Sequence, residues 1–262
     1  MKLGLALGGG GARGSYQIGV IKALIESGLL ADLKIVAGTS IGAINACLVM
    51  GELTFEQMES VWMHLDNNEL YGSIDRFKQD KLGIFNQRRM YDSLVKLQSK
   101  EAIRNSKIKG LAVACRVKEL GLIKQALKSN VDEVIFTLNE LEDPHLAVLA
   151  SSSIPVVFGP TKIGDDYYVD GGLVNNLPID HLIDEGCTVI YAISLDQHYD
   201  LSKYPPHIKI IDFSPKTKLS KTVLGILNFS EQNIKDKIAR GYNDALVLIK
   251  ELNLNEKNLN NI

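Results

Sequence analysis

A serine between two glycines is the residue pattern best suited to chemistry in this sequence, at GTSIG, residues 38–42. An apolar run precedes it and a helical pattern follows it, which predicts a strand-to-helix turn. Gly38 and Gly42 allow a tight turn that lifts the Ser40 hydroxyl above the sheet, at a helix N-terminus that favours developing negative charge. Ser40 is therefore a candidate nucleophile for acyl transfer. The alternative is a simple helix N-cap with glycines for packing.

A glycine-rich run, GGGGARG at residues 8–14, follows a short apolar strand and opens a helix. Its G-x-G-x-x-G spacing could bind a dinucleotide pyrophosphate, or its amides could stabilise an oxyanion. A dinucleotide site needs an acidic residue at the end of the next strand. That strand ends without one, and Asp32 precedes it. The pattern favours an oxyanion hole formed by the backbone of Gly9, Gly10, Gly11 and Ala12, with Gly14 completing the motif.

An aspartate followed by two glycines, Asp170, Gly171 and Gly172, follows a predicted hairpin at residues 161–169. Such a tripeptide is often only a turn. However, the carboxyl ends of strands in an α/β sheet converge, so Asp170 could meet Ser40 and the glycine run. Burial would raise its pKa from about 3.9 and make it a better base. His198 offers a rival, because Ser40, Asp170 and His198 follow the chain order of an α/β-hydrolase triad.

The helices and strands that must position these residues are predicted to form one α/β domain over residues 1–262. Strand, helix, strand and helix alternate over the first 50 residues, which predicts a mainly parallel sheet covered by helices on both faces. Further strands are predicted at KGLAVACRV, DEVIFTL, CTVIYAISL and HIKIIDF. Thr54 and Gln57 form a predicted capping box for a helix over 54–65. Residues 66–88 read as a lid-like excursion, and residues 228–252 as a C-terminal helix.

Composition narrows the function classes. The 262 residues carry 29 basic and 31 acidic side chains, a formal charge of −2 that points neither to nucleic acid nor to a strongly anionic membrane surface. Cys47, Cys115 and Cys187 lie in apolar surroundings without metal-ligand spacing, which predicts buried, reduced thiols. No secretory leader or membrane span is recognisable, so we expect a cytoplasmic protein.

Taken together, GGGGARG, GTSIG and DGG resemble the patatin-like phospholipase family in its bacterial, single-domain form. The resemblance extends to ASSSIPVVFGP (150–160) and GLVNNLPI (172–179), and covers most of residues 3–195. It implies a compact three-layer α/β fold and a Ser–Asp dyad without histidine. Ser40 would be the nucleophile and Asp170 the base, with the glycine amides as the oxyanion hole. Arg13 would match the family's basic residue, a substrate or anion contact; its alternative role is a solvated side chain.

These observations predict a serine acyl-ester hydrolase acting on lipids, of phospholipase A or lysophospholipase type, that requires no metal or organic cofactor. Residues 66–90 and the C-terminal helix are candidates for covering the acyl site. We expect a lipid or other acyl ester as substrate, transient contact with a membrane surface and no nucleic-acid partner; the oligomeric state is not indicated. The alternatives are a lipid-binding or regulatory protein without turnover, a triad esterase using His198, and a nucleotide-binding module.

Overall fold

A computed structural model describes residues 1–65, 82–85, 88–196, 199–220 and 223–252. Its main sheet has eight strands, and seven of them follow one another across it in a fixed order. These are β10 (Lys209–Asp212), β9 (Val189–Ile193), β1 (Leu3–Leu7), β2 (Leu33–Thr39), β4 (Lys109–Val117), β8 (Asp166–Asp170) and β7 (Thr161–Ile163). The eighth, β5 (Val131–Thr137), pairs with β4, and β3 (Gly83–Phe85) pairs separately with β6 (Val156–Phe158).

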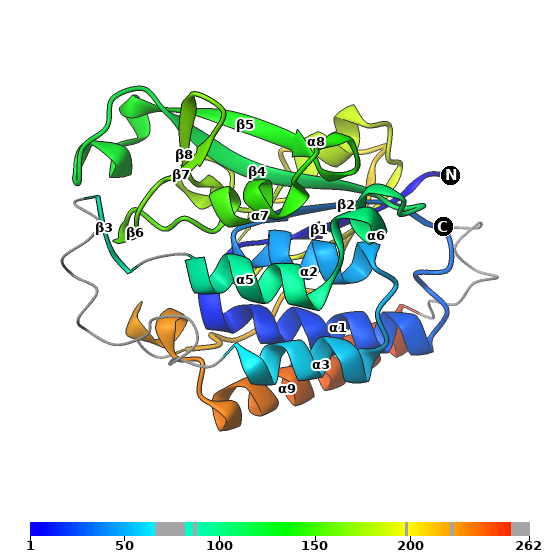
Figure 1. The fold of residues 1–262 in the computed structure, drawn as a ribbon. Helices are drawn as coiled ribbons and strands as arrows, with labels where there is room; N and C mark the ends of the chain where they lie inside the picture. The colour runs from blue at the N-terminus through cyan, green and yellow to red at the C-terminus, as the bar shows by residue number, and fades with distance from the viewer. Residues whose placement is uncertain (66–81, 86–87, 197–198, 221–222, 253–262) are drawn as a thin grey trace.

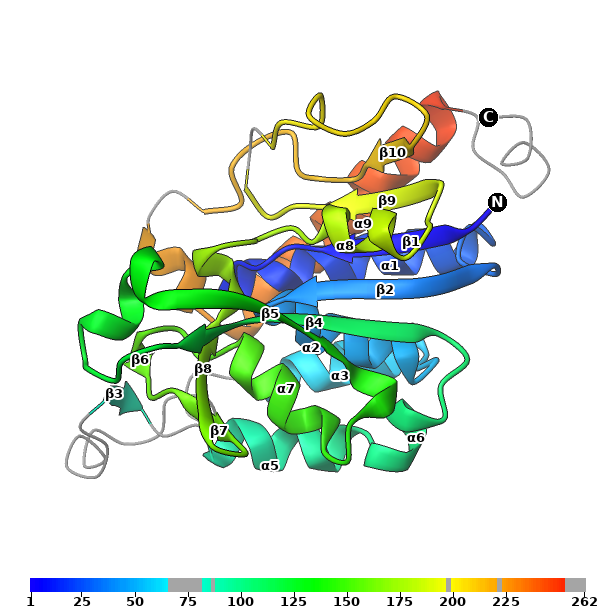
Figure 2. The same ribbon diagram turned by 90° about the horizontal axis from the view of Figure 1, so that it is seen from above.

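The centre of the sheet is parallel and one side of it is antiparallel. Strands β10, β9, β1, β2 and β4 run in the same direction, in the order that Figure 2 shows from above. Strands β5 and β8 run antiparallel to β4, and β7 runs antiparallel to β8. The predicted mainly parallel α/β sheet is therefore confirmed, with the hairpin at residues 161–170 forming its antiparallel edge.

Helices cover both faces of this sheet, with a much thicker layer on one face (Figure 1). The α-helices are α1 (Ser15–Glu26), α2 (Ile41–Met50), α3 (Phe55–His64), α5 (Arg88–Leu97), α6 (Lys100–Arg104), α7 (Pro144–Ser151), α8 (Ile179–Asp184) and α9 (Glu231–Glu251). Short 3-10 turns include η1 (Gly11–Gly14), η3 (Lys124–Ala126), η4 (Lys128–Asn130), η6 (Gly171–Leu173) and η7 (Val223–Leu227).

Alternate residues of the central strands contribute to two separate hydrophobic cores. In β1, Leu5 and Leu7 pack into the larger core with α1, α2, α3 and α9, whereas Ala6 faces the smaller core under α8. In β9, Tyr191 and Ile190 divide in the same way. Because successive side chains of a strand point to opposite faces, two covered faces require continuous apolar strands, which is the pattern of LGLAL.

The sequence located most of these elements, and it missed those with weak local signals. The predicted capping box of α3 is confirmed: Gln57 N donates to Thr54 Oγ1 (3.3 Å), and Thr54 N donates to Gln57 Oε1 (2.9 Å). The three-residue strands β3 and β6 were not predicted, because so short a run carries no periodicity. Most of the predicted excursion at 66–88 lies outside the described residues.

The C-terminal helix α9 packs lengthwise against α1. A Cβ at Gly19 of α1 would approach Ile238 O to 2.0 Å, and one at Gly241 of α9 would approach Tyr16 O to 2.0 Å. Backbone contact this close requires glycine on both helices. Helix α9 therefore belongs to the hydrophobic core of the domain.

The predicted state of the cysteines is confirmed, since Cys47, Cys115 and Cys187 are buried and free. Burial raises the pKa of the Cys47 and Cys115 thiols to about 12, which keeps them protonated and unreactive at neutral pH. Among the residues described, no helix combines the length and apolar character needed to cross a bilayer.

Candidate active site

Ser40 occupies a strained turn between β2 and α2. Its φ of 57° and ψ of −127° lie in a region that non-glycine residues rarely adopt. The turn is closed by glycine, because a Cβ at Gly38 would lie 2.2 Å from Gly42 O and one at Gly42 would lie 2.1 Å from Leu7 O. The Ser40 side chain makes no capping bond to the helix. The role of a simple N-cap is therefore wrong.

Strand β4 explains how a residue 130 positions away meets this serine. One edge of β4 pairs with β5 from Leu111 to Val117. Its other edge pairs with β2 up to Val113, opposite Thr39, and then with β8 from Ala114, opposite Asp170. Strands β2 and β8 thus approach each other end to end along the same edge. The ends that meet there carry Ser40 and Asp170.

The two side chains are in direct contact. Ser40 Oγ donates to Asp170 Oδ2 at 2.5 Å. The other carboxylate oxygen, Oδ1, accepts from Gly172 N (2.8 Å) at the start of η6, so the turn role of this aspartate coexists with the serine contact. A Cβ at Gly171 would lie 2.3 Å from Val113 O, which fixes the turn against β4. Both side chains are buried, with exposed fractions of 6% for Ser40 and 7% for Asp170.

Burial raises the pKa of Asp170 to about 6, although its hydrogen bonds from Ser40 and Gly172 oppose the rise. At neutral pH the group is still mainly a carboxylate. Its proton affinity is higher than that of an aspartate in water, so the geometry and the pKa both suit proton transfer from a serine.

Ser151, at the end of α7, holds the backbone of the turn. Its Oγ accepts from Ser40 N (2.9 Å) and donates to Val113 O of β4 (2.5 Å). Thr39 Oγ1 donates to Asn175 O (2.9 Å) from the other side. These bonds fix the strained residue between α7, β4 and the segment after Asp170.

The glycine run lies beside Ser40 and is held by Asn176. Gly9 N donates to Asn176 O (3.0 Å), so this amide is already engaged. Within the described part of the chain, the N–H groups of Gly10, Gly11 and Ala12 donate to no protein oxygen, but Ala12 is fully buried. Gly10 and Gly11 line the cleft next to Ser40. Of the four predicted oxyanion donors, these two are the accessible ones.

Arg13 braces this run. Its Nε donates to Gly10 O (3.2 Å), and its Nη1 donates to Leu195 O (3.2 Å) and to Asp196 Oδ1 (2.6 Å). The guanidinium therefore joins the glycine run to the segment after β9, while it also lines the cleft. The alternative of a freely solvated side chain is wrong. His198, the rival base, lies outside the described residues.

A buried polar chain supports the same run from beneath. Trp62 Nε1 donates to Asn45 Oδ1 (2.9 Å), and Asn45 Nδ2 donates to Gly14 O (3.0 Å) and to Gln17 Oε1 (2.8 Å). Gln17 Nε2 in turn donates to Gly8 O (2.8 Å). The carbonyls of the first and last residues of the run thus accept hydrogen bonds from side chains that are fully buried.

Two cavities meet at Ser40. A cleft of about 190 Å³ is lined by the polar residues Ser40, Asp170, Arg13 and Asn176, together with apolar residues that include Ile154 and Leu173. A second cavity of about 40 Å³, which shares Ser40 with the cleft, is lined almost wholly by apolar atoms. Its wall includes residues Ile41, Ile44, Leu65, Met90, Phe158, Ile226, Leu227 and Phe229. An ester placed at Ser40 could therefore extend an apolar chain into one cavity and a polar group into the other.

Three residues of the C-terminal region line the apolar cavity. Ile226 and Leu227 belong to η7, and Phe229 stacks on Trp62 with ring centroids 6.1 Å apart. The predicted acyl-site cover at the C-terminus thus involves the segment before α9, while α9 itself packs on α1. Met90 lies in the other predicted region, residues 66–90, of which 66–81 and 86–87 are outside the described residues.

The sequence profile of the patatin-like phospholipases matches residues 5–183, which include the glycine run, Ser40 and Asp170. The chain belongs to the patatin-like phospholipase family. The profile ends before β9, so the segment 226–229 that lines the apolar cavity lies beyond the matched part.

Curated relatives of this patatin-like chain include much longer proteins. It is 26% identical over 196 residues to "Lysophospholipase NTE1" of Kluyveromyces lactis, covering 74% of this chain and 12% of that protein. It is 27% identical over 209 residues to "Patatin-like phospholipase domain-containing protein 7" of Rattus norvegicus, covering 77% and 14%. "Probable lipid hydrolase 463L" of Invertebrate iridescent virus 6 is nearer in size, with 27% identity over 67% of this chain and 61% of that protein.

Among solved structures, the patatin-like fold resembles VipD from Legionella pneumophila, with a TM-score of 0.56 and 14% identity over 95% of this chain and 67% of that one. The type III effector ExoU gives a TM-score of 0.50 and 14% identity, over 95% of this chain and 53% of that one. At these identities the likeness concerns the fold.

Several residues that build the site were not assigned roles from the sequence. Ser151 lies in ASSSIPVVFGP, and Asn175 and Asn176 lie in GLVNNLPI, so the motifs contained them without revealing what they contact. Asn45 carried a weaker signal, as the one polar residue of the apolar helix α2, and Gln17 carried none, because α1 contains other polar residues. A buried polar side chain needs a partner, which sequence cannot supply.

Proposed function

We propose that this protein is a serine hydrolase of lipid acyl esters, in which Ser40 is the nucleophile and Asp170 the general base. The hydrogen bond between Ser40 Oγ and Asp170 Oδ2 carries the proposal, because Ser40 lines both an apolar cavity and a cleft that contains the polar side chains of Arg13 and Asn176. Family membership and relatives named as lysophospholipases support lipid esters as the substrate class.

The reaction would follow covalent catalysis. Asp170 accepts the Ser40 proton as Oγ attacks the acyl carbonyl, and the Gly10 and Gly11 amides donate to the oxyanion. When the carbon–oxygen bond to the leaving alcohol breaks, protonated Asp170 returns the proton to that oxygen. Water then attacks the acyl-Ser40 ester with Asp170 again as base, and a fatty acid leaves. Every step uses groups of this chain, water and the ester.

The cavities orient the substrate. The acyl chain occupies the apolar cavity beside Ile41 and Phe229, where burial of each methylene contributes about 0.8 kcal/mol. The alcohol half, with its polar head group, occupies the cleft beside Arg13 and Asn176. Because the apolar cavity is small, about 40 Å³, we expect it to hold part of one acyl chain at a time.

A fluorophosphonate probe tests the nucleophile without assuming a substrate. We expect the purified protein to be labelled at Ser40, and the Ser40→Ala variant to resist labelling. Incubation with p-nitrophenyl esters of increasing chain length, followed by product analysis with phospholipid and lysophospholipid, then identifies the acyl preference. An intact, folded protein that neither reacts with the probe nor releases fatty acid would instead favour a lipid-binding protein without turnover.

A further inference from the structure

The connection between β4 and β5, residues 118–130, exposes four large aliphatic side chains, and we call it the hairpin tip. Leu120, Leu122 and Leu127 are 44%, 45% and 48% exposed, and Ile123 is 73% exposed. Scattered apolar residues on a surface need no explanation, but four within eight positions of one connection do. The tip is therefore a candidate interaction surface.

The exposure is built into an ordered structure. Gln125, two residues after Ile123, is fully buried; its Nε2 donates to Leu82 O (2.5 Å) and its N to Gly121 O (3.1 Å). Asn130 Nδ2 donates to Glu119 O (2.8 Å) and Lys124 O (3.1 Å), closing the tip on itself. A tip that served only as a connection would bury its aliphatic residues and expose its amide, which is the reverse of this arrangement.

The tip follows the carboxyl end of β4, which lies at the same end of the sheet as the carboxyl end of β2, where Ser40 is found. Ala114 of β4 pairs with Asp170, and β4 continues to Val117 before the tip begins. At about 3.3 Å per residue, the tip starts about 13 Å beyond Asp170 along the strand. Figures 1 and 2 show it on the same side of the molecule as β6 and η7.

A chain of contacts joins the tip to the cleft. Leu82, which accepts from Gln125, leads into β3, and Gly83 of β3 pairs with Val156 of β6. Val156 is itself 36% exposed and has a φ of 70°, strained for a β-branched residue. Ile154 and Pro155, immediately before it, line the cleft. The tip is therefore connected through β3 and β6 to residues that line the cleft.

The charges around the tip suit a lipid surface with anionic head groups. The segment from Arg116 to Asp132, with both ends counted, carries four basic and two acidic side chains, although the whole chain carries a formal charge of −2. Lys118, Lys124 and Lys128 are all exposed beside the aliphatic residues. Their ion pairs, such as that of Lys124 with Glu119, are solvent-exposed and therefore weak. Such lysines can reach head groups while aliphatic neighbours enter the acyl boundary.

We propose that the hairpin tip docks the protein on anionic membranes, inserting Leu120, Leu122, Ile123 and Leu127 so that the cleft mouth faces the lipid. A single small apolar surface with a few lysines gives weak, reversible binding that depends on salt. The inference extends the proposed lipid hydrolysis, because an ester held in a membrane must reach the cleft from the lipid side.

Vesicle sedimentation of the Ser40→Ala protein tests the docking without turnover. We expect binding to equimolar phosphatidylcholine–phosphatidylglycerol vesicles that weakens in salt, and weaker binding to phosphatidylcholine alone. The double variant Leu122→Asp/Ile123→Asp should reduce the partition coefficient by about tenfold or more. The matched control Leu246→Asp/Val247→Asp, on exposed positions of α9, should change the partition coefficient by less than about twofold.

The outcomes of these experiments distinguish failure of the docking surface from failure of the proposed hydrolase function. A tip variant that binds as its parent does, or a parent that binds neither vesicle, would overturn the docking surface; the second result would leave a protein partner for the tip. In the Ser40-intact background, the tip variant should hydrolyse a dispersed short-chain ester at the parent's rate, which also shows that it is folded. Vesicle binding without any ester hydrolysis would refute the proposed function and keep the docking surface.

Discussion

Two carboxylates lie at opposite ends of α7, and their surroundings give them opposite properties. At its beginning, Asp143 Oδ2 accepts from Lys100 Nζ (2.5 Å) and Tyr91 OH (2.6 Å). Burial raises the pKa of Asp143, but these bonds outweigh it and the net pKa is lowered. At the other end, Asp170 N donates to Ser153 O (2.9 Å), and the described residues place no Lys or Arg in an ion pair with Asp170. Its pKa is raised to about 6.

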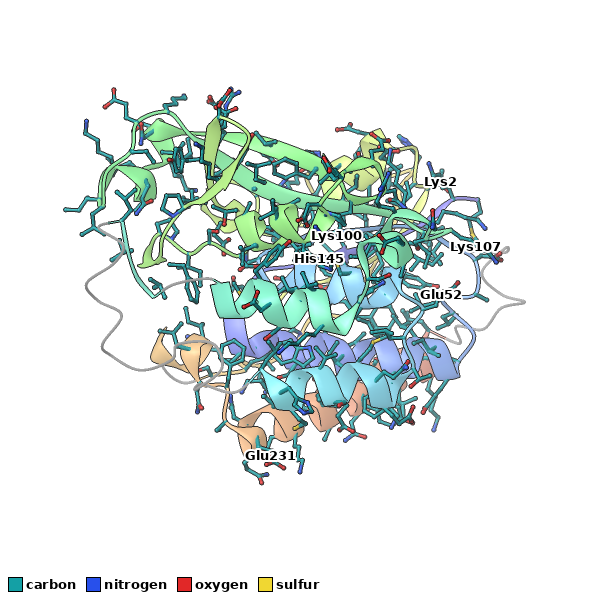
Figure 3. The ribbon with its side chains drawn as sticks, in the orientation of Figure 1. Lys2, Glu52, Lys100, Lys107, His145 and Glu231 are labelled. Atoms are coloured by element: carbon teal, nitrogen blue, oxygen red, sulfur yellow. The ribbon has the colours of Figure 1, made fainter. Side chains whose placement is uncertain are left out.

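The difference reflects both burial and pairing: Asp170 is more deeply buried and has no paired cation among the described residues, which raises its pKa, whereas Asp143 is partly exposed and bonded to Lys100 and Tyr91. His145, labelled with Lys100 in Figure 3, lies with its Nδ1 3.7 Å from Asp143 Oδ1. Burial lowers the pKa of His145, although Asp143 opposes this, so the ring is mainly neutral at pH 7. An Asp–His pair of this kind resembles part of a triad, yet its carboxylate is held by Lys100 and Tyr91 and is separate from Ser40. We expect it to act in stability.

The largest expected effect is the difference in catalytic activity between the Asp170 and Asp143 variants. Asp170→Asn keeps the shape of the side chain but removes the base, so we expect kcat for ester hydrolysis to fall about 10³-fold or more. Asp143→Asn should leave kcat within about threefold. Steady-state hydrolysis of a short-chain ester by both variants makes the comparison. Equal losses in the two variants would contradict it, and normal activity of Asp170→Asn with loss in His198→Ala would favour a triad.

The two asparagine variants should change the free energy of unfolding in opposite directions. The pKa of Asp170 is higher in the folded state, so its favourable contribution is complete below its ordinary value of 3.8 and is lost as the pH rises through about 6. Replacing it with Asn should therefore raise the free energy of unfolding at pH 8 by about 1–3 kcal/mol. Urea unfolding monitored by fluorescence measures the change, and a destabilised Asp170→Asn would show that burial of this carboxylate is not the dominant strain.

For Asp143 the sign is reversed. Its pKa is lowered on folding, so its stabilisation is present above the ordinary value of 3.8 and is lost as the pH falls through the lowered value. Asp143→Asn weakens the bonds from Lys100 and Tyr91, and we expect it to reduce the free energy of unfolding at pH 8 by about 1–2 kcal/mol. The same urea titration at this pH provides the measurement, and an unchanged midpoint would contradict a structural role.

The pH profile sharpens the comparison further. Because the proposed base must be ionised, kcat/KM should be half its maximum near the Asp170 pKa of about 6, level off about one pH unit above it and fall by about tenfold per pH unit well below it. The Asp143→Asn protein should give the same profile, scaled by its activity. A rate that stays constant down to about pH 4, near the ordinary aspartate pKa, would show that Asp170 is not perturbed in the way burial predicts.

The smallest expected effect is a decrease in kcat when Ser151, the last residue of α7, is replaced. Ser151→Ala leaves the Ser40 N–H without its acceptor, so we expect kcat to fall several-fold with KM little changed. The control is Ser152→Ala, whose hydroxyl donates to Val148 O of the same helix (3.0 Å). Comparing kcat for the two alanine variants tests whether α7 positions the nucleophile. Equal values would place Ser151 outside the positioning of Ser40.

The sequence by itself determined the longer strands, the principal helices and the three motifs, because hydrophobic periodicity and glycine spacing are local properties. It also placed Ser40 in a turn and named Asp170 as its partner, through the resemblance of the joint pattern to one family. It could not assign roles to Ser151, Asn176 or Gln17, because hydrogen-bond partners distant in the chain carry no periodic signal.

Only the tertiary structure decided the rest. Strand β4 pairs with β2 and β8 along one edge, and this non-local pairing brings Ser40 Oγ within 2.5 Å of the Asp170 carboxylate. Burial and the lack of a paired cation then set the Asp170 pKa, a property of packing that composition does not contain. The overall charge of −2 likewise concealed the basic, aliphatic hairpin tip, because a sum over the chain discards where the charges lie.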